Sequence, residues 1–496
     1  MAEKIKRALI SIPDRYRRVF LGQIVVYLLA YSSIFRANFN YADDVGRVAH
    51  GYHGWMVFSR HTSTFLSNII HADWYLADVS PLTQILAVIF LSLAGAVLVY
   101  LFVEESKTGV ISTIAVLLIG LSPYFLGCIS YKYDSPYMAL SILVSIVPFL
   151  FVDKRKWAFE VSSFVCLLIM CTSYQAAAGI YPMISIFLFG KMIHEKKENG
   201  KAAGFVARAV LSYIVSLGFY ALFLMHSAIA GVSSEGFSVG RIFGCYKMWF
   251  GLIKSDFKNS WILLIIALIV LSIAMMSMSS EQGMLRGICL SAIVVVFSGL
   301  AVLGVLPVLS REVYNPRYMM SFGVFLSLLA LTACNGIKIG ENKSFVKVMI
   351  ALMTKVIVCL LAWCFFVYMF SYGNCLYEQK RYTEYHFQLA LDDIMHSEDM
   401  MEGNVTKICQ RGTIGLSPII QRVAGNNTLL ERTIGYNIPG IGGEGNSWFT
   451  LYYGLDNLEE IPKEDIVLPL KTIARARTHT ISVSGDVLVI DWNSEE

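Results

Sequence analysis

The amino-acid sequence predicts an all-α polytopic membrane protein with about 11 transmembrane helices and a small C-terminal α/β domain outside the membrane. Hydrophobic residues make up 56% of the 496 positions and charged residues only 15%, whereas soluble domains contain about 25% charged residues. Long apolar runs recur as far as Tyr372, and many can supply the ~20 apolar residues of a spanning helix. Beyond Tyr372 the chain is polar and rich in Gly and Asn. We therefore expect a transmembrane domain over residues 1–372 and an extracytoplasmic domain over residues 373–496.

This composition excludes a water-soluble enzyme, a disordered chain and a disulfide-rich secreted module. The net charge of +4 gives no sign of a nucleic-acid partner. The ten cysteines form no CxxC pair and no zinc-site spacing. Cys375 and Cys409 lie in the polar region, where they could pair in an oxidising compartment or remain free thiols.

The apolar runs, taken in order, give the expected helices. The first run, from about Val19 to Ile34, follows a basic segment that includes Lys4, Lys6 and Arg7. No small-residue cleavage site follows it, so we interpret it as an uncleaved transmembrane helix with a cytoplasmic N-terminus. The later runs start near Leu82, Gly109, Pro136, Trp157, Gly179, Phe205, Trp261, Gly287, Tyr318 and Val348.

The distribution of Lys and Arg among the loops predicts the orientation in the membrane. Basic residues gather in one alternate set of loops, which we assign to the cytoplasm: 104–107, 153–156, 194–201, 279–286 and 338–347. The other set is expected on the outer side: 36–81, 122–135, 173–178, 227–260 and 310–317. An odd number of spans then places the C-terminus outside as well, and the apolar run at 486–490 predicts a strand there.

Two adjacent carboxylates, Asp43 and Asp44, follow the first expected helix at the outer membrane boundary. An ionised group is costly at that depth and is usually kept for function. Crowding beside a low-dielectric region can raise the pKa of one carboxylate toward that of a general base. An equally open alternative is that one of the two caps a helix that begins near Val45.

Other polar residues of the expected outer loops are candidates for binding. Residues 46–68, which include Arg47 and Arg60, mix aromatic and basic side chains, as is typical of a helix lying in the membrane interface. Their histidines indicate interface residues more than a metal site, so no cofactor is expected, although a divalent cation stays open. Lys132 and Asp134 could simply pair at a helix end. Arg317 suits a bound phosphate or, equally, an interfacial anchor.

The order of these motifs resembles the GT-C superfamily of polyprenol-phosphate-sugar glycosyltransferases, and more narrowly the serotype-converting O-antigen glucosyltransferases. The resemblance covers roughly residues 1–330. It rests on an ordered set of short motifs: Asn40-Tyr41-Ala42-Asp43-Asp44 with Arg47, Asp78-Val79-Ser80-Pro81-Leu82, Ser122-Pro123-Tyr124-Phe125, Tyr133-Asp134-Ser135-Pro136 and Ser173-Tyr174-Gln175.

The resemblance implies an inverting hexosyltransferase of the bacterial inner membrane. Such an enzyme moves a glucosyl group from undecaprenyl phosphate glucose to a lipopolysaccharide O-antigen sugar on the periplasmic face. Asp43 or Asp44 would be the catalytic base, and Asp134 and Gln175 would bind sugar hydroxyl groups. Cations at the membrane boundary would bind the donor phosphate: Arg47, Arg60, Lys132 and Arg317.

Two other functions share the same helices. A flippase or transporter of a lipid-linked sugar usually shows internal repeats and helices broken at mid-membrane. Here no repeat occurs, and the polar groups gather on one face. An O-antigen polymerase would need a large outer loop between late helices, whereas the loop at 227–260 is modest. No Walker A, GxGxxG, GxSxG or HExxH motif supports nucleotide-driven transport or soluble hydrolase chemistry.

Overall fold

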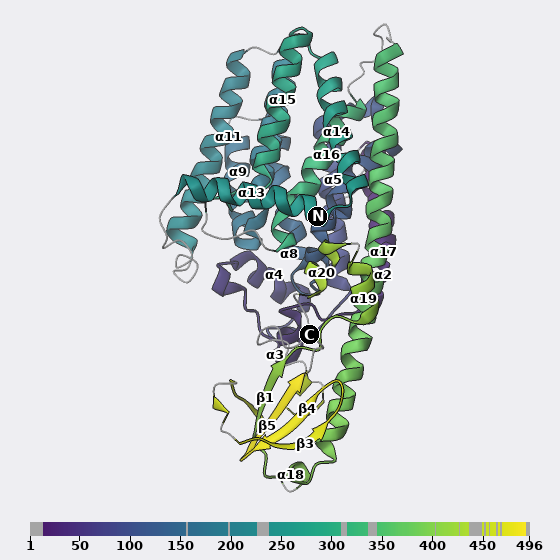
Figure 1. Ribbon diagram of the computed structural model, residues 1–496. Helices are drawn as coiled ribbons and strands as arrows, with labels where there is room; N and C mark the ends of the chain where they lie inside the picture. The colour runs from purple at the N-terminus through teal and green to yellow at the C-terminus, as the bar shows by residue number, and fades with distance from the viewer. Residues whose placement is uncertain are drawn as a thin grey trace.

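The computed structural model shows a bundle of helices followed by a small β-sheet (Figure 1). The basic residues Lys4, Lys6 and Arg7, and residues 311–314 of one expected outer loop, lie outside the described residues. The structure describes residues 13–154, 157–196, 199–225, 238–308, 315–335, 345–401, 403–425, 427–435, 449–450, 453–455, 457–462, 465–466 and 469–492.

Within these residues, eight helices are long and apolar enough to cross a membrane, and a helix pair bent by 45° adds a ninth. The bend falls at Pro123, which cannot donate a backbone hydrogen bond. The elements of the bent pair are α6 (Val110–Leu121), η3 (Pro123–Phe125) and α7 (Leu126–Ser130). The elements of the eight spans are α2 (Asp14–Ala37), α5 (Leu82–Phe102), η5 (Gln175–Gly179) with α10 (Ile180–His194), α11 (Asn199–Phe219) with η6 (Tyr220–Leu224), α14 (Asn259–Met278), α15 (Met284–Ala301), η8 (Pro316–Met319) with α16 (Ser321–Asn335), and α17 (Phe345–Met395).

Two further apolar runs form helices that are shorter than a typical span. They are α8 (Ser135–Ile146), continued by η4 (Val147–Phe151), and α9 (Ala158–Ser173). Every expected span up to Tyr372 therefore contains a helix, but the expected count of about 11 spans is not confirmed. Helix α8 begins next to Asp134 and α9 ends next to Tyr174, and both of these residues are buried inside the protein.

The last candidate span, α17, runs for 51 residues from the far end of the bundle to the sheet (Figure 1). The composition change at residue 373 therefore falls inside one continuous helix. The strand order of the sheet is β2-β1-β5-β4-β3, with β1 parallel to both neighbours and the remaining pairs antiparallel. The expected strand at 486–490 is confirmed as β5. The strands are β1 (Lys407–Gly412), β2 (Glu459–Glu460), β3 (Lys471–Arg475), β4 (Thr480–Ser484) and β5 (Val487–Trp492).

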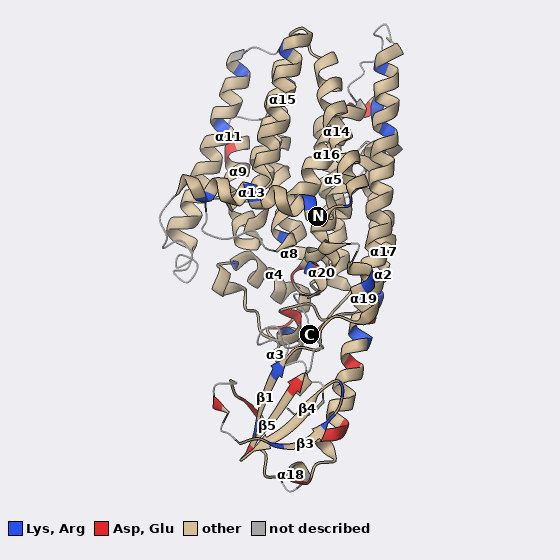
Figure 2. Ribbon diagram, in the orientation of Figure 1, with Lys and Arg blue, Asp and Glu red and all other residues tan. Residues whose placement is uncertain are grey.

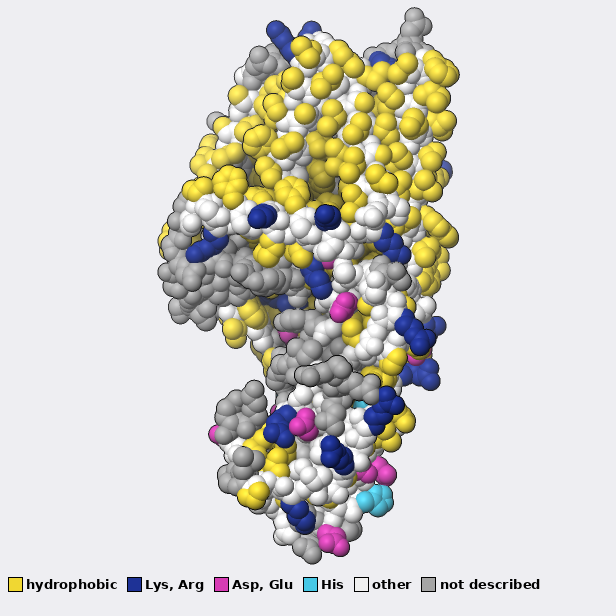
Figure 3. Space-filling model, in the orientation of Figure 1, with side chains coloured by type: hydrophobic (Ala, Val, Ile, Leu, Met, Phe, Trp, Pro, Cys, Tyr) yellow, Lys and Arg dark blue, Asp and Glu magenta, His cyan; other side chains and the backbone are white. Residues whose placement is uncertain are grey.

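Two helices beside the bundle expose apolar side chains, and one of them, α4, buries polar ones. In α4 (His61–His71), Ser63 and Ser67 are buried whereas Phe65 is 66% exposed. Helix α13 (Val239–Asp256) lies across the bundle, and its basic side chains mark the lower border of a hydrophobic surface (Figure 3). Charged side chains are sparse on the bundle between that border and its far end (Figure 2). This arrangement is typical of helices in a membrane interface, as expected for residues 46–68.

The remaining short elements surround the site or follow α17. They are α3 (Asp44–His50), η1 (Trp55–Phe58), η2 (Glu105–Lys107), α18 (Glu398–Met401), α19 (Pro418–Ala424) and α20 (Thr428–Gly435). Cys375 and Cys409 are both buried free thiols, so the open question of their pairing is answered in favour of free cysteines.

Candidate active site

Polar motifs that are far apart in the sequence meet at the end of the bundle that faces the sheet. Figure 1 shows α3 and α4 at this end, between the bundle and the strands. Side-chain contacts join four of the expected outer loops there: Arg47 with Asp134, Arg60 with Gln175, and Arg317 with the ring of Tyr131.

Asp44 is fully buried, and backbone N–H groups hold its carboxylate. The Lys132 amide donates to Oδ2 at 2.8 Å, and the Tyr41 and Tyr133 amides donate to the carboxylate at 3.4 Å. Burial raises the pKa of Asp44 to about 8, although the Arg47 charge acts in the opposite direction. The side chain therefore ties the start of α3 to the loop before α8.

Asp43 differs from Asp44 in exposure, since about 40% of its side chain is accessible. It stands at the N-cap position of α3 but makes no side-chain capping hydrogen bond, so the capping interpretation is wrong for this residue. Arg47 Nη2 lies 3.8 Å from its Oδ2, and Arg317 is close enough to interact with it electrostatically. Of the two adjacent carboxylates, Asp43 is the one that a ligand can reach.

Arg47 and Asp134 form a buried ion pair between α3 and the start of α8. The Arg47 guanidinium lies over the Trp55 ring, 4.6 Å from its centroid, and Trp55 Nε1 donates to Asp134 Oδ1 at 2.5 Å. The Arg47 and Asp134 side chains are only 3% and 5% exposed. Both Asp134 oxygens are thus occupied by neighbouring side chains.

Lys132 is also paired, but with a different residue from the one expected. Its Nζ lies 3.0 Å from Asp78 Oδ2 and donates to Asn40 Oδ1 at 2.7 Å. The Lys132 carbonyl accepts a hydrogen bond from Thr83, which fixes this residue on the α5 side, whereas Asp134 faces α3. The expected Lys132–Asp134 pair is therefore wrong.

Arg60 lies against aromatic rings instead of a carboxylate. Its guanidinium is 4.8 Å from the Tyr174 ring centroid, and Nε donates to Gln175 Oε1 at 3.3 Å. Gln175 Nε2 in turn donates to the Phe58 carbonyl at 3.0 Å and to Tyr220 Oη at 2.9 Å. Burial lowers the pKa of Arg60, and the nearby Arg317 charge adds to this effect.

Arg317 likewise sits on aromatic rings, 4.9 Å from the Tyr131 centroid and 5.6 Å from that of Tyr318. Its Nε is buried and makes no hydrogen bond. Among the residues that the structure describes, no carboxylate lies within ion-pairing distance of Arg317 or Arg60. Among the described residues, the site thus holds two guanidinium groups without ion-pair partners, and one of them, Arg317, interacts electrostatically with the accessible Asp43.

Helix α20 reaches the same region from the C-terminal part of the chain. Tyr41 Oη donates to the Thr433 carbonyl at 2.8 Å, next to the carboxylate pair. Arg432 Nη1 lies 2.6 Å from Asp256 Oδ1 at the end of α13, and Tyr124 Oη donates to the other oxygen at 3.0 Å. Burial raises the pKa of Asp256, against the effect of the Arg432 charge.

The aromatic rings beneath the cations are contacts of the candidate site that the sequence did not identify. Tyr131 and Tyr174 lie beside or inside the quoted motifs, and Trp55 lies in the aromatic and basic segment 46–68, so cation–π pairing within the outer loops was an available signal. Tyr220 had no such signal, because it reaches Gln175 only through η6, a π-turn after α11. Turns of this kind occur frequently at functional sites.

The histidines of the outer segment serve local structure. His53 bonds with Asn68 Oδ1 at 2.6 Å, and His71 bonds with the Ala77 carbonyl at 2.8 Å. In the described part of the chain, no three His, Cys, Asp or Glu side chains group as metal ligands do.

Comparison with known proteins gives the family of the chain. A family model described as "Glucosyl transferase GtrII" matches residues 32–328, from α2 to α16. The chain belongs to this family. The matched region contains all eight candidate site residues and ends before the sheet. GtrII membership implies glycosyl transfer, and it confirms the resemblance inferred from the motifs.

One curated relative is an uncharacterised 55.3 kDa protein in the gtrB 5′ region of Salmonella phage P22. It is 26% identical to this chain over 255 residues, which is 48% of the chain. The match spans about half the length of that relative, 51%.

Proposed function

We propose that this GtrII-family chain transfers a glucosyl group from undecaprenyl phosphate glucose to a hydroxyl group of an O-antigen sugar. One observation carries the proposal. The accessible carboxylate of Asp43 lies near Arg317, which in turn lies near Arg60, and neither arginine forms an ion pair with a carboxylate among the described residues. A base for the acceptor and a binding site for a phosphate leaving group are the two requirements of this reaction.

The reaction is a direct displacement at C1 of the donor sugar. The acceptor hydroxyl oxygen forms a bond to C1, while the bond from C1 to the phosphate oxygen breaks and its electron pair leaves with the phosphate. The hydroxyl proton passes to Asp43, which acts as the general base. Attack from the face opposite the phosphate inverts the anomeric carbon.

Asp43 suits the role of base better than Asp44. A base must contact the acceptor hydroxyl, and only Asp43 has an accessible carboxylate. Asp44 is enclosed by three backbone amides, and with a pKa of about 8 it is mostly protonated at neutral pH. Asp44 therefore holds the start of α3 in place beside the base.

Arg60 and Arg317 suit the phosphate better than the other two candidate cations. Arg47 and Lys132 are already neutralised by Asp134 and Asp78. A guanidinium without a carboxylate partner can donate two parallel hydrogen bonds to phosphate oxygens. Held near each other, the two arginines stabilise the negative charge that grows on the phosphate as it leaves.

Gln175 and Asp134 were both candidates for binding sugar hydroxyl groups, and the contacts favour Gln175. Its side chain reaches Arg60, so it lies beside the proposed phosphate site and can orient both the guanidinium and the donor sugar. Asp134 already accepts from Arg47 and Trp55. We assign Asp134 to positioning α3 and η1.

The site and residues 373–496 face the periplasm in this proposal, and the N-terminus is cytoplasmic. Support comes from the alternation of Lys- and Arg-rich loops with the loops that build the site. A reporter fused after Glu496 should therefore be active only if it functions in the periplasm.

The central test is a glycosyl-transfer assay with purified protein, undecaprenyl phosphate glucose and O-antigen acceptor. Asp43→Asn keeps the size of the side chain and removes the base, so kcat should fall by at least about 100-fold. Asp73→Asn is the matched control, because Asp73 is an exposed carboxylate of the same outer segment. Full turnover in Asp43→Asn would refute the proposed mechanism, and absence of transfer by the wild-type protein would refute the function.

A further inference from the structure

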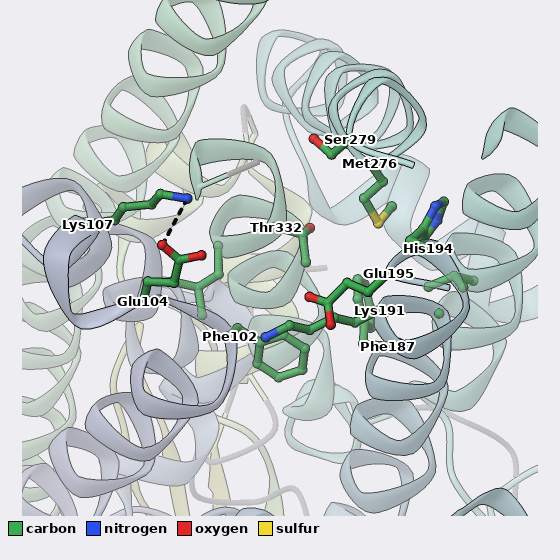
Figure 4. Close-up of a pocket in the computed structure, with 13 residues that line it drawn as sticks. Phe102, Glu104, Lys107, Phe187, Lys191, His194, Glu195, Met276, Ser279 and Thr332 are labelled. Carbon is green, nitrogen blue, oxygen red and sulfur yellow. Dashed lines mark ion pairs between the residues drawn. The ribbon is translucent and has the colours of Figure 1, made fainter. Parts of the chain in front are cut away.

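A cavity of about 160 Å³ lies at the end of the bundle opposite to the candidate active site. Figure 4 shows the residues that line it. Helices α5 and α10 both begin beside that site and end at the cavity. Its walls include Phe102, Phe187 and Leu331. Neither the family match nor the proposed reaction gives this cavity a role.

The cavity lies where four candidate spans end with their C-termini, and a fifth, α15, lines it through Val294. The lining includes Phe102 and His194, the last residues of α5 and α10, and also Ser279 and Thr332 from the ends of α14 and α16. The ends of membrane spans lie at the level of the lipid headgroups. Each helix C-terminus carries roughly half a negative charge, so four of them together favour a cation.

Charged side chains reach the cavity from two sides (Figure 4). Glu104 and Lys107 follow α5 and pair at 3.3 Å. Lys191 and Glu195 come from the end of α10, where Lys191 Nζ donates to the Leu101 carbonyl at 3.3 Å. Two ammonium groups and two carboxylates therefore line one small space with apolar walls.

We propose that this cavity binds the headgroup of a zwitterionic phospholipid that carries a primary ammonium group, such as phosphatidylethanolamine. Its phosphate would lie toward Lys107 and Lys191, and its ammonium group toward Glu104, Glu195 and the helix C-termini. The first methylene groups of the acyl chains would contact the apolar walls. This lipid site is independent of the proposed transfer reaction.

The charge distribution distinguishes this ligand from an anionic lipid. Two lysines balance two glutamates, and the helix C-termini add partial negative charge. An anionic headgroup has no positive group to offer the two carboxylates, which would repel it. A zwitterionic headgroup satisfies both signs of charge at once.

The test measures thermal unfolding of the full chain in detergent, with dihexanoyl phosphatidylethanolamine as the probe. The lipid should raise the Tm of the wild-type protein in a saturable manner. Glu104→Gln and Lys191→Met should each weaken the apparent affinity about tenfold, as expected for loss of a charge-assisted contact. Lys154→Met, an exposed lysine that does not line the cavity, is the matched control and should bind normally.

Three results would overturn the proposal. Dihexanoyl phosphatidylglycerol could raise the Tm equally, which would mean that the ammonium group is not recognised. Free phosphoethanolamine could give the same shift at the same concentration, which would indicate a soluble ligand instead of a lipid. Unchanged affinity in both cavity variants would place the lipid elsewhere. The first two comparisons use only the wild-type protein, so they hold even if a variant fails to fold.

Discussion

Replacing Arg317 by Met separates its two sequence-based interpretations, a phosphate ligand and an interfacial anchor. The substitution removes the charge and keeps most of the side-chain length. A charge-assisted contact to phosphate contributes about 1.5–3 kcal/mol, so kcat/KM should fall roughly 10- to 150-fold. Arg317→Lys should have a kcat/KM between those of the wild type and Arg317→Met, because lysine keeps the positive charge but cannot form the bidentate hydrogen bonds of a guanidinium group.

The stability of Arg317→Met should change little, in contrast to its activity. Arg317 has no carboxylate partner among the described residues, and its Nε is buried without a hydrogen bond. Removing it gives up a cation–π contact worth about 0.5–2 kcal/mol, but it also ends the burial of an uncompensated charge. The two effects largely cancel, so the Tm of Arg317→Met should stay near that of the wild type.

The assay is initial-rate glucosyl transfer per folded molecule, with the folded fraction taken from thermal unfolding of the same preparation. Gln379→Met provides the control for a buried polar residue remote from the site, which should lose stability and keep its turnover once corrected for folding. Normal turnover in Arg317→Met together with a lowered Tm would refute the phosphate assignment and support the interfacial anchor.

Buried charges near the site lead to three other expected outcomes. Because burial raises the pKa of Asp44 to about 8, the folded state keeps a proton that the unfolded chain releases near pH ~4. The free energy of unfolding should therefore fall as the pH rises from about 4 to about 8, and Asp44→Asn should remove this slope in thermal unfolding. Arg47→Met leaves Asp134 buried without its cation and should lower the free energy of unfolding by about 3–5 kcal/mol in denaturant titrations. Asp256→Asn breaks the ion pair with Arg432 that holds α20, so limited proteolysis should cut the C-terminal segment faster; unchanged cleavage would contradict this role.

The helices and the gathering of the polar motifs at one end of the bundle could be predicted from the sequence, because each depends on local signals. Apolar runs of sufficient length form helices in a membrane, and short polar motifs between them lie at one end of the bundle. The 51-residue length of α17 was not predictable in this way. Hydropathy drops after Tyr372, but residues 373–395 contain no proline and favour helix. The backbone therefore stays helical where the side chains change from apolar to polar.

The pairing of charges could not be read from the sequence, because it depends on how the helices pack. Lys132 and Asp134 are two positions apart, yet each pairs with a residue far along the chain, Asp78 and Arg47. The turn before α8 directs the two side chains to opposite neighbours. Sequence alone also left Asp43 and Asp44 equivalent, and only burial distinguishes them.

Charge balance connects the base and the phosphate site in the proposed reaction. With Asp44 protonated at neutral pH, four cations face three ionised carboxylates, an excess of one positive charge. A donor phosphodiester carries one negative charge and neutralises this excess. As the reaction proceeds, the leaving phosphate gains a second negative charge while Asp43 takes up a proton. The ionisable side chains in this balance are Asp43, Asp44, Asp78, Asp134, Arg47, Arg60, Lys132 and Arg317.

The same balance predicts how the variant without the base should bind the product. Asp43→Asn removes one carboxylate charge before any reaction, so the empty site already matches the charge of a phosphate dianion. Asp43→Asn should therefore bind undecaprenyl phosphate more tightly than the wild type, by about tenfold for a gain near 1.4 kcal/mol, although it turns over far more slowly. Fluorescence titration with a soluble short-chain polyprenyl phosphate measures this affinity, with Asp73→Asn again as the control. Equal or weaker binding in Asp43→Asn would mean that Asp43 does not share an electrostatic environment with the phosphate, and the coupling between base and leaving group would have to be abandoned.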